Sequence, residues 1–175
     1  MRVMGVDLST CTGVAVVGGD KKVIYAEEVT FKKERGWPRA SMIAGRILEI
    51  HAEYKPDLVV CEGYGFANAH SLVTLVEIGS IVRYFLWQEG IKSIECPPNS
   101  LKKFVTGKGN SKKEEIMMAV LKHWGYESAT NNIADAVGLG MFGLGCLGVT
   151  FPAISMKAVE EVMKSQGDVV NSVCN

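Results

Sequence analysis

The stretch Val3-Met-Gly-Val-Asp7-Leu-Ser-Thr-Cys-Thr-Gly13-Val-Ala-Val-Val17 decides the fold. An apolar run ends in Asp7, a turn of small residues follows, and a second apolar run begins at Gly13. This pattern predicts two strands joined by a short turn, with a carboxylate at the edge of a sheet. Carboxylates in that position often bind metal ions, in proteins of several functions, so the rest of the chain has to decide the function.

The composition fits one domain. The chain has 175 residues, of which 47% are hydrophobic and 8% aromatic, enough for one core but not for two domains of ordinary size. The formal net charge is zero, so binding to a polyanion would require local clusters of positive charge. The cysteines at positions 11, 61, 96, 146 and 174 are odd in number and lack Cys-x-x-Cys spacing, which predicts reduced, mostly buried thiols.

Two segments bear on localisation. No basic segment followed by an apolar one precedes Asp7, so we expect a cytoplasmic protein. Residues 136–154 carry no charge, but glycines and Pro152 interrupt them. A helix buried between a sheet and its neighbours is therefore favoured over a membrane span.

The first half of the chain shows alternating strand and helix patterns. We expect strands at 2–8, 13–18 and 23–31, a helix at 38–54, a strand at 57–62, a helix at 70–88 and a strand at 91–96. The first three strands should form an antiparallel meander, and the later strands should be parallel, with right-handed crossovers. The strand at 57–62 is continuously apolar, which predicts a central position buried on both faces, and it ends in Glu62.

The remainder is predicted to be helical. Helices are expected at 101–105, 111–124, 132–146 and, with an amphipathic pattern, 155–166. Ser111 should cap its helix, with Glu114 completing a capping box. We expect residues 1–150 to form one domain and residues 151–175 a C-terminal tail with a short helix.

Three acidic residues are predicted to converge. If the two strands that end in Asp7 and Glu62 are neighbours, their carboxylates meet at one edge of the sheet. Asn132 and Asp135 are three residues apart at a helix start and share one face. Like charges this close repel unless a cation lies between them, and hard oxygen ligands select Mg²⁺ or Mn²⁺. Two such ions, about 4 Å apart, can activate a water for phosphodiester hydrolysis.

Four segments together resemble RuvC-type Holliday junction resolvases of the ribonuclease H-like superfamily. They are Gly5-Val-Asp7-Leu-Ser-Thr-Cys-Thr-Gly13, Val59-Val-Cys-Glu62, Pro98-Asn-Ser-Leu-Lys-Lys-Phe-Val-Thr-Gly-Lys-Gly-Asn-Ser-Lys-Lys113 and Asn132-Ile-Ala-Asp135-Ala136. The resemblance implies an α/β, ribonuclease H-like fold: a mixed five-stranded sheet, with three antiparallel strands and then two parallel strands, flanked by helices. It also implies a metal-dependent endonuclease that cleaves branched DNA, above all four-way junctions.

By this resemblance, Asp7, Glu62 and Asp135 would be catalytic acids that hold two Mg²⁺ ions, with Mn²⁺ as an alternative. A fourth metal-binding position, usually an acid or a histidine in the family, matches Asn132. An amide oxygen can bind a metal but brings no negative charge. We therefore predict weaker binding of one ion and a preference for Mn²⁺.

Positive charge is clustered between Cys96 and Glu114, a segment without an acid. Lysines beside flexible glycines at a helix start are suited to contact DNA phosphates, although a solvated helix surface is an equally simple explanation. The lysines are Lys102, Lys103, Lys108, Lys112 and Lys113. A second basic group, which could contact the backbone or be an ordinary loop, comprises Lys32, Lys33, Arg35 and Arg39.

The loop after Glu62 carries Tyr64 and Phe66 between glycines. Such aromatic residues can stack on unpaired bases, or be buried against the core. By the resemblance, Phe66 is the better match to an aromatic residue that RuvC-like proteins place at the junction centre.

The helix at 70–88 is more apolar than one packing face requires. This surplus predicts a homodimer through the helix, as the resemblance also implies, whereas a fully enclosed helix of a monomer is the alternative. Two other functions remain open. The Asp7 motif is similar to the first phosphate loop of actin-like ATPases and sugar kinases, which need two such domains, and Asn132 leaves room for a non-catalytic branched-DNA-binding protein.

Overall fold

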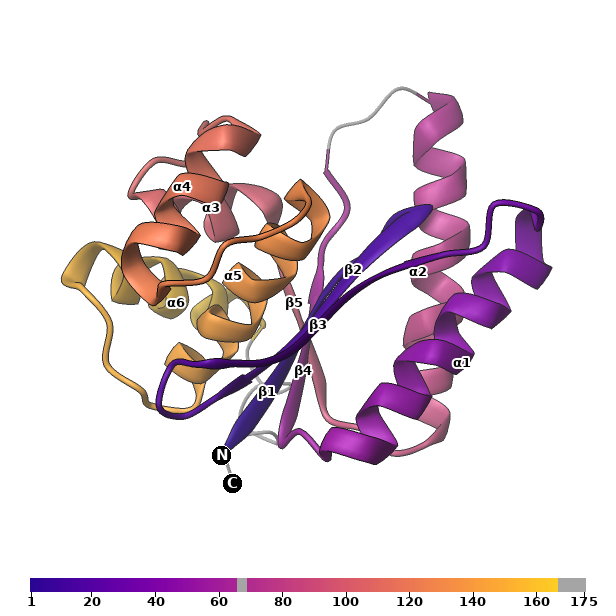
Figure 1. Ribbon diagram of the computed structural model, residues 1–175, viewed down its shortest axis with the longest axis horizontal. Helices are drawn as coiled ribbons and strands as arrows, with labels where there is room; N and C mark the ends of the chain where they lie inside the picture. Colours follow the sequence, from indigo (N-terminus) through magenta and orange to yellow (C-terminus); the bar gives the residue numbers. More distant parts are fainter. Residues whose placement is uncertain (66–68, 167–175) are drawn as a thin grey trace.

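A computed structural model describes residues 1–65 and 69–166 as a five-stranded mixed sheet between two layers of helices (Figure 1). The strands are β1 (Arg2–Asp7), β2 (Cys11–Gly18), β3 (Val23–Thr30), β4 (Leu58–Glu62) and β5 (Ser93–Cys96). Their order in the sheet is β3-β2-β1-β4-β5. β1, β2 and β3 are antiparallel, whereas β4 is parallel to β1 and β5 is parallel to β4. The predicted sheet is confirmed.

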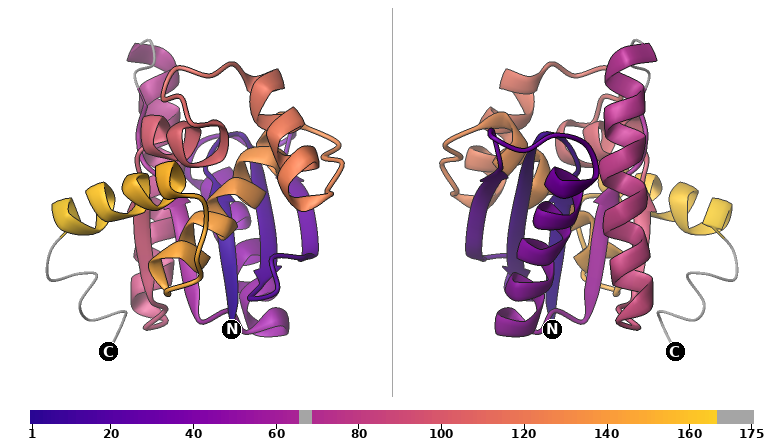
Figure 2. Two further views of the ribbon diagram at one scale, coloured as in Figure 1. Left: turned by 90° about the vertical axis from the view of Figure 1, so that its left-hand side faces the viewer. Right: turned by 90° about the vertical axis from the view of Figure 1, so that its right-hand side faces the viewer.

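Two helices cover one face of the sheet and four cover the other, as the side views show (Figure 2). The first layer contains α1 (Gly36–Tyr54) and α2 (Ala69–Gln88). The second contains α3 (Pro98–Thr106), α4 (Lys113–Trp124), α5 (Asn131–Cys146) and α6 (Ala153–Gln166). Each layer buries its own hydrophobic cluster against the sheet, because alternate residues of the central strands point to opposite faces.

The register of the central strands brings two acids to one edge. Val6 of β1 lies opposite Cys61 of β4, so the next residues, Asp7 and Glu62, end neighbouring parallel strands. β4 is buried from Leu58 to Cys61, which confirms the predicted central strand.

Helix α5 lies directly on β1 and β2, because glycine is present where its backbone touches the sheet. A Cβ atom on Gly5 would come within 2.0 Å of the carbonyl oxygen of Ala136, and one on Gly13 within 2.0 Å of that of Asn132. No side chain fits there. These contacts bring the first turns of α5, with Asp135, against the end of β1.

Apart from Asp135, residues 133–146 of α5 are buried, which agrees with the predicted helix between sheet and neighbours. Within the described residues, none of the helices is long and apolar enough to cross a membrane. Cys61, Cys96 and Cys146 are buried and reduced, as predicted.

The predicted cap of α4 is wrong by one residue. Lys112, not Ser111, occupies the N-cap position, and its backbone N–H donates to the Glu115 carboxylate at 2.7 Å. The hydroxyl of Ser111 instead donates to the carbonyl oxygen of Lys108 at 2.9 Å. It also lies 2.5 Å from the hydroxyl oxygen of Thr106. Ser111 therefore fixes the turn between α3 and α4.

The predicted amphipathic helix near the C-terminus is present as α6. Its buried residues Ser155, Ala158, Val159 and Val162 pack into the cluster formed by α3 and α5. The hydroxyl of Ser155 donates to the carbonyl oxygen of Phe104 at 2.7 Å. The helix is thus continuous with the core on this face of the sheet.

Candidate active site

A cavity of about 360 Å³ lies at the carboxyl ends of β1 and β4. It contains every acid that the sequence singled out. The lining comprises Asp7, Leu8, Ser9, Glu62, Gly63, Tyr64, Gly65, Leu75, Pro98, Leu101, Lys102, Lys113, Ile116, Asn132 and Asp135. One end of the sheet, α3, α4 and the start of α5 therefore meet around the predicted cluster.

Asp7 is buried, with 6% of its surface exposed. Burial raises its pKa well above the ordinary value, and the nearby charge of Glu62 raises it further. Burial also raises the pKa of Glu62, which accepts a hydrogen bond from the protonated Asp7 side chain. Without a counter-ion, each of the two carboxyl groups therefore disfavours the ionisation of the other, as expected for like charges in a desolvated pocket.

Asp135 is the third acid of the cavity. Burial, followed by the charge of Asp7, raises its pKa to about 7. The charges of Lys113 and Lys102 act in the opposite direction without offsetting the burial. The three carboxyl groups therefore influence one another's ionisation, and the cavity is poised to accept positive charge.

The five lysines predicted to contact DNA have different surroundings. Lys102 and Lys113 line the cavity with the acids. Lys103 instead forms an ion pair with Glu161 of α6, at 2.8 Å. Lys108 and Lys112 lie on the α3–α4 turn and at the start of α4. Only the first two are part of the acidic pocket, and the DNA contacts of all five stay predictions.

The sequence reasoning missed Glu28, on β3. Asn132 donates a hydrogen bond from Nδ2 to the Glu28 carboxylate at 3.0 Å, and the charge of Glu28 contributes to the raised pKa of Asp7. Since Nδ2 is held by Glu28, the amide oxygen is the free end of the Asn132 side chain. The sequence contained only an indirect signal for Glu28. In the predicted meander Glu28 pairs with Gly13, and the start of α5 packs against Gly13.

The aromatic residues of the loop after β4 are only partly described. Tyr64 lines the cavity and is 42% exposed. Its hydroxyl accepts a hydrogen bond from Nη1 of Arg83 at 2.9 Å, and the guanidinium lies 4.7 Å from its ring centre. Phe66 lies outside the described residues.

The donor set fits a divalent cation by its chemistry. Three carboxyl groups and one free amide oxygen are hard oxygen ligands of the kind that Mg²⁺ and Mn²⁺ prefer. Among the residues that the structure describes, no three acidic, histidine or cysteine side chains are close enough together to chelate one ion. The pocket thus supplies oxygen ligands of the right kind, with three carboxyl groups gathered in one cavity.

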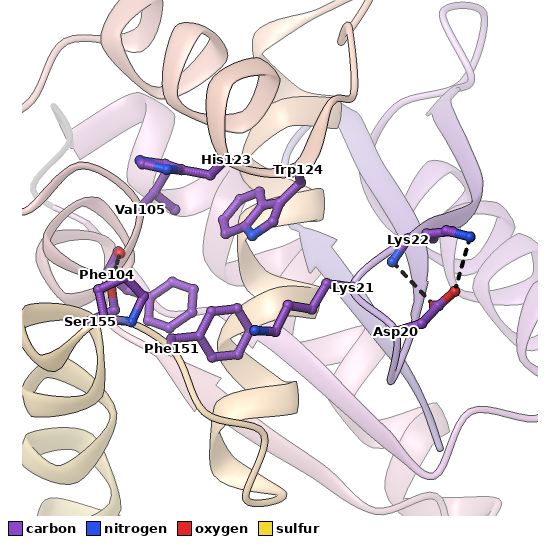
Figure 3. A pocket seen from close by; sticks show the side chains of 10 residues that line it. Asp20, Lys21, Lys22, Phe104, Val105, His123, Trp124, Phe151 and Ser155 are labelled. Atoms are coloured by element: carbon purple, nitrogen blue, oxygen red, sulfur yellow. Dashed lines mark hydrogen bonds and ion pairs between the residues drawn. The ribbon is translucent and has the colours of Figure 1, made fainter.

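A second cavity, of about 460 Å³, lies at the opposite end of the sheet (Figure 3). Phe104, Trp124 and Phe151 gather there beside the β2–β3 turn, and the ammonium group of Lys21 lies 4.6 Å from the centre of the Phe151 ring. Lys22 is paired with Asp20. None of the predicted site residues lies in this aromatic cavity.

A mixed sheet in this strand order, with acids at the ends of its two central parallel strands and on a covering helix, defines a nuclease of the ribonuclease H-like fold. The family model of the crossover junction endodeoxyribonuclease RuvC matches residues 3–142. The chain therefore belongs to the RuvC family, whose members are endonucleases that act on branched DNA, and the resemblance in the four sequence segments is confirmed.

Individual relatives agree with this family. RuvC of Synechococcus sp. strain WH7803 is 26% identical over 154 residues, which cover 82% of this chain and 97% of the relative. The structure of T. thermophilus RuvC in complex with Holliday junction substrate superposes with a TM-score of 0.70 at 25% identity, covering 81% of this chain and 91% of that one. The yeast mitochondrial Holliday junction resolvase, at 11% identity and a TM-score of 0.55, shares the fold and covers 97% of this chain and 83% of that one.

Proposed function

We propose that this chain resolves four-way DNA junctions by metal-dependent hydrolysis in the cavity of Asp7, Glu62 and Asp135. The observation that carries the proposal is the gathering of the three carboxyl groups in one cavity at the carboxyl ends of two adjacent parallel strands. Burial raises the pKa of each of these groups. Burying several carboxyl groups together is electrostatically unfavourable, and clusters of this kind are typical of functional sites.

Asp7, Glu62, Asp135 and the amide oxygen of Asn132 would hold two divalent ions, Mg²⁺ or Mn²⁺. Such ions, when bound, supply the positive charge that favours attack of water on a phosphodiester and departure of the leaving oxygen. Asp7 is the most deeply buried of the three acids, and its pKa responds to Glu62 while its own charge acts on Asp135. It would therefore help to hold the metal ions together with both of these acids.

The chain's own residues also orient the DNA. Lys102 and Lys113 line the same cavity as the acids, where ammonium groups can hold the phosphate oxygens beside the scissile bond. Lys108 and Lys112 extend this positive surface along the α3–α4 turn. Tyr64, and Phe66 by the family resemblance, are proposed to stack on unpaired bases near the junction centre.

Glu28 explains how an asparagine can serve at the fourth position. Its carboxylate fixes Nδ2 of Asn132 and so turns the amide oxygen towards the cavity. It also adds a negative charge near Asp7. The site is proposed to keep part of the electrostatic effect of a fourth acid, although that acid is not a direct ligand.

The enzyme is proposed to act as a homodimer through α2. One face of this helix packs on the sheet through Ile78, Val82 and Leu86, which are buried. The opposite face exposes large apolar side chains at helical spacing on both sides of the exposed Ser80. They are Val73, Val76, Tyr84 and Trp87. A second copy of the same face is the simplest partner for it, and two-fold symmetry would place two active sites on symmetry-related strands.

The test is cleavage of a labelled four-way junction by the purified protein in Mg²⁺, Mn²⁺ or EDTA, with Asp7→Asn as the matched variant. We expect paired incisions that require both the metal and Asp7. Junction binding without incision by the wild-type protein in either metal would instead support a non-catalytic branched-DNA-binding protein.

A further inference from the structure

A third cavity lies beside the active site and is positively charged. It has a volume of about 530 Å³ and occupies the space between the β1–β2 turn, the end of β3, the start of α1 and α2. Its lining comprises Thr10, Cys11, Thr30, Phe31, Lys32, Arg35, Gly36, Arg39, Thr74 and Glu77. Thr10 and Thr74 directly follow and precede Ser9 and Leu75 of the active-site cavity, so the two hollows adjoin at one end of the sheet.

The cavity is lined by three cations, Lys32, Arg35 and Arg39. No ion pair among residues 1–65 and 69–166 involves Lys32, Arg35 or Arg39. In addition, the Nε atom of Arg39 is buried and has no hydrogen-bond acceptor in this part of the chain. A buried donor without a partner is destabilising, and a guanidinium group is suited to bind a phosphate through two parallel hydrogen bonds.

The start of α1 adds further donors. No side chain caps the helix at its N-cap residue, Arg35, and its first turn contains no acid. The first backbone N–H groups of the helix and its dipole therefore favour an anion at this end. Hydroxyl groups of Thr10, Thr30 and Thr74 on the cavity wall can also donate to phosphate oxygens.

One acid opposes this charge. Glu77 lines the cavity from α2, and a Cβ atom on Gly36 would lie 3.6 Å from its Oε1 atom. Three cations and one carboxylate leave a net charge of about +2 for an anion to neutralise. Neutralising Glu77 should therefore strengthen the binding of an anion, whereas neutralising one of the cations should weaken it.

We propose that this cavity binds a backbone phosphate of the DNA next to the cleaved bond, with Arg39 and Arg35 as its principal contacts. The proposal rests on the proposed function, since it assumes a DNA substrate in the adjoining active site. It also gives a role to Lys32, Arg35 and Arg39, the three residues of the second basic group that line the cavity. The pocket would anchor the strand on the β3–α1 side of the acids, opposite Lys102 and Lys113.

The experiment measures junction binding in EDTA, without cleavage, as a function of salt concentration. Each phosphate contact contributes about 0.9 to the slope of log K against log salt. Arg39→Gln should therefore lower the magnitude of the slope by about 1 and weaken binding roughly tenfold at low salt. The exposed Arg35→Gln should act in the same direction, which guards against a folding defect of the Arg39 variant, and Glu77→Gln should tighten binding.

Lys33→Gln is the matched control, because Lys33 is an exposed cation of the same loop that does not line the cavity. Equal effects of Lys33→Gln and Arg39→Gln, or no change of slope in either arginine variant, would overturn the proposal. Metal-dependent cleavage with an unchanged slope would refute only this phosphate site. An altered slope without any cleavage in metal would support the site and contradict the proposed function.

Discussion

The substitution Asp135→Asn is expected to stabilise the metal-free protein while it abolishes cleavage. The pKa of Asp135 is raised from 3.8 to about 7, first by burial and then by the charge of Asp7. Asparagine has nearly the same shape but cannot ionise. The carboxylate form is thus disfavoured in the folded state, and its replacement removes the repulsion at pH values where wild-type Asp135 is charged.

The magnitude follows from the linkage between protonation and folding. Between pH 4 and pH 7 the folded state holds a proton on Asp135 that the unfolded state has released, so the stability contributed by this group falls as the pH rises. At about 1.4 kcal/mol per pH unit, the penalty of ionisation is about 4 kcal/mol at pH 8 and about 2 kcal/mol at pH 5. These are upper values, because Asp135 keeps some contact with solvent and Lys102 and Lys113 lie nearby.

Urea unfolding in EDTA, followed by tryptophan fluorescence at pH 5 and pH 8, measures this difference. We expect the variant to exceed the wild-type stability at pH 8 and the gap to narrow at pH 5. Glu160→Gln, which removes an exposed acid from α6, should leave the free energy of unfolding unchanged at both pH values. Mg²⁺ should narrow the gap at pH 8, since it stabilises only the protein that binds it. A variant less stable than the wild type at pH 8, or a gap independent of pH, would refute this reasoning.

Four further outcomes are expected. Glu28→Gln should weaken Mn²⁺ binding about tenfold in calorimetry, because the orienting carboxylate of Asn132 is lost; an unchanged affinity would exclude this role. Asn132→Asp alone should improve metal binding less than the same change combined with Glu28→Gln, since the new carboxylate would lie against Glu28, and calorimetry of both variants tests this. Trp87→Lys should convert a dimer into a monomer in light scattering, and a wild-type protein that is already monomeric contradicts the α2 interface. Lys102→Gln should weaken junction binding in a gel-shift assay more than Lys103→Gln, because Lys103 is already paired with Glu161.

The sequence predicted the fold and the acidic pocket because both depend on local patterns. Apolar runs that end in Asp7 and Glu62 define neighbouring parallel strands, and their carboxyl ends must share an edge. Glu28 could not be predicted in this way, since its contact with Asn132 joins residues 104 positions apart through a side-chain hydrogen bond. The shift of the α4 cap from Ser111 to Lys112 has a different cause: Thr106 and Lys108, a few residues earlier in the chain, engage the Ser111 side chain, and these local hydrogen bonds compete with capping.

The separation of charge explains how a chain without net charge can act on a polyanion. Asp7, Glu62 and Asp135 are gathered in one desolvated crevice, where burial and, after it, the charge of a neighbouring acid raise the pKa values of Asp7 and Asp135. Cations flank this crevice: Lys102 and Lys113 from the side of α3 and α4, and the cluster of Lys32, Arg35 and Arg39 from the side of α1. A DNA strand can therefore be held by its phosphates on both sides of the acids, while metal ions neutralise the crevice itself. Because α5 reaches the sheet only where Gly5 and Gly13 lack side chains, the same close packing that brings Asp135 to Asp7 also creates the electrostatic strain that a bound cation would relieve.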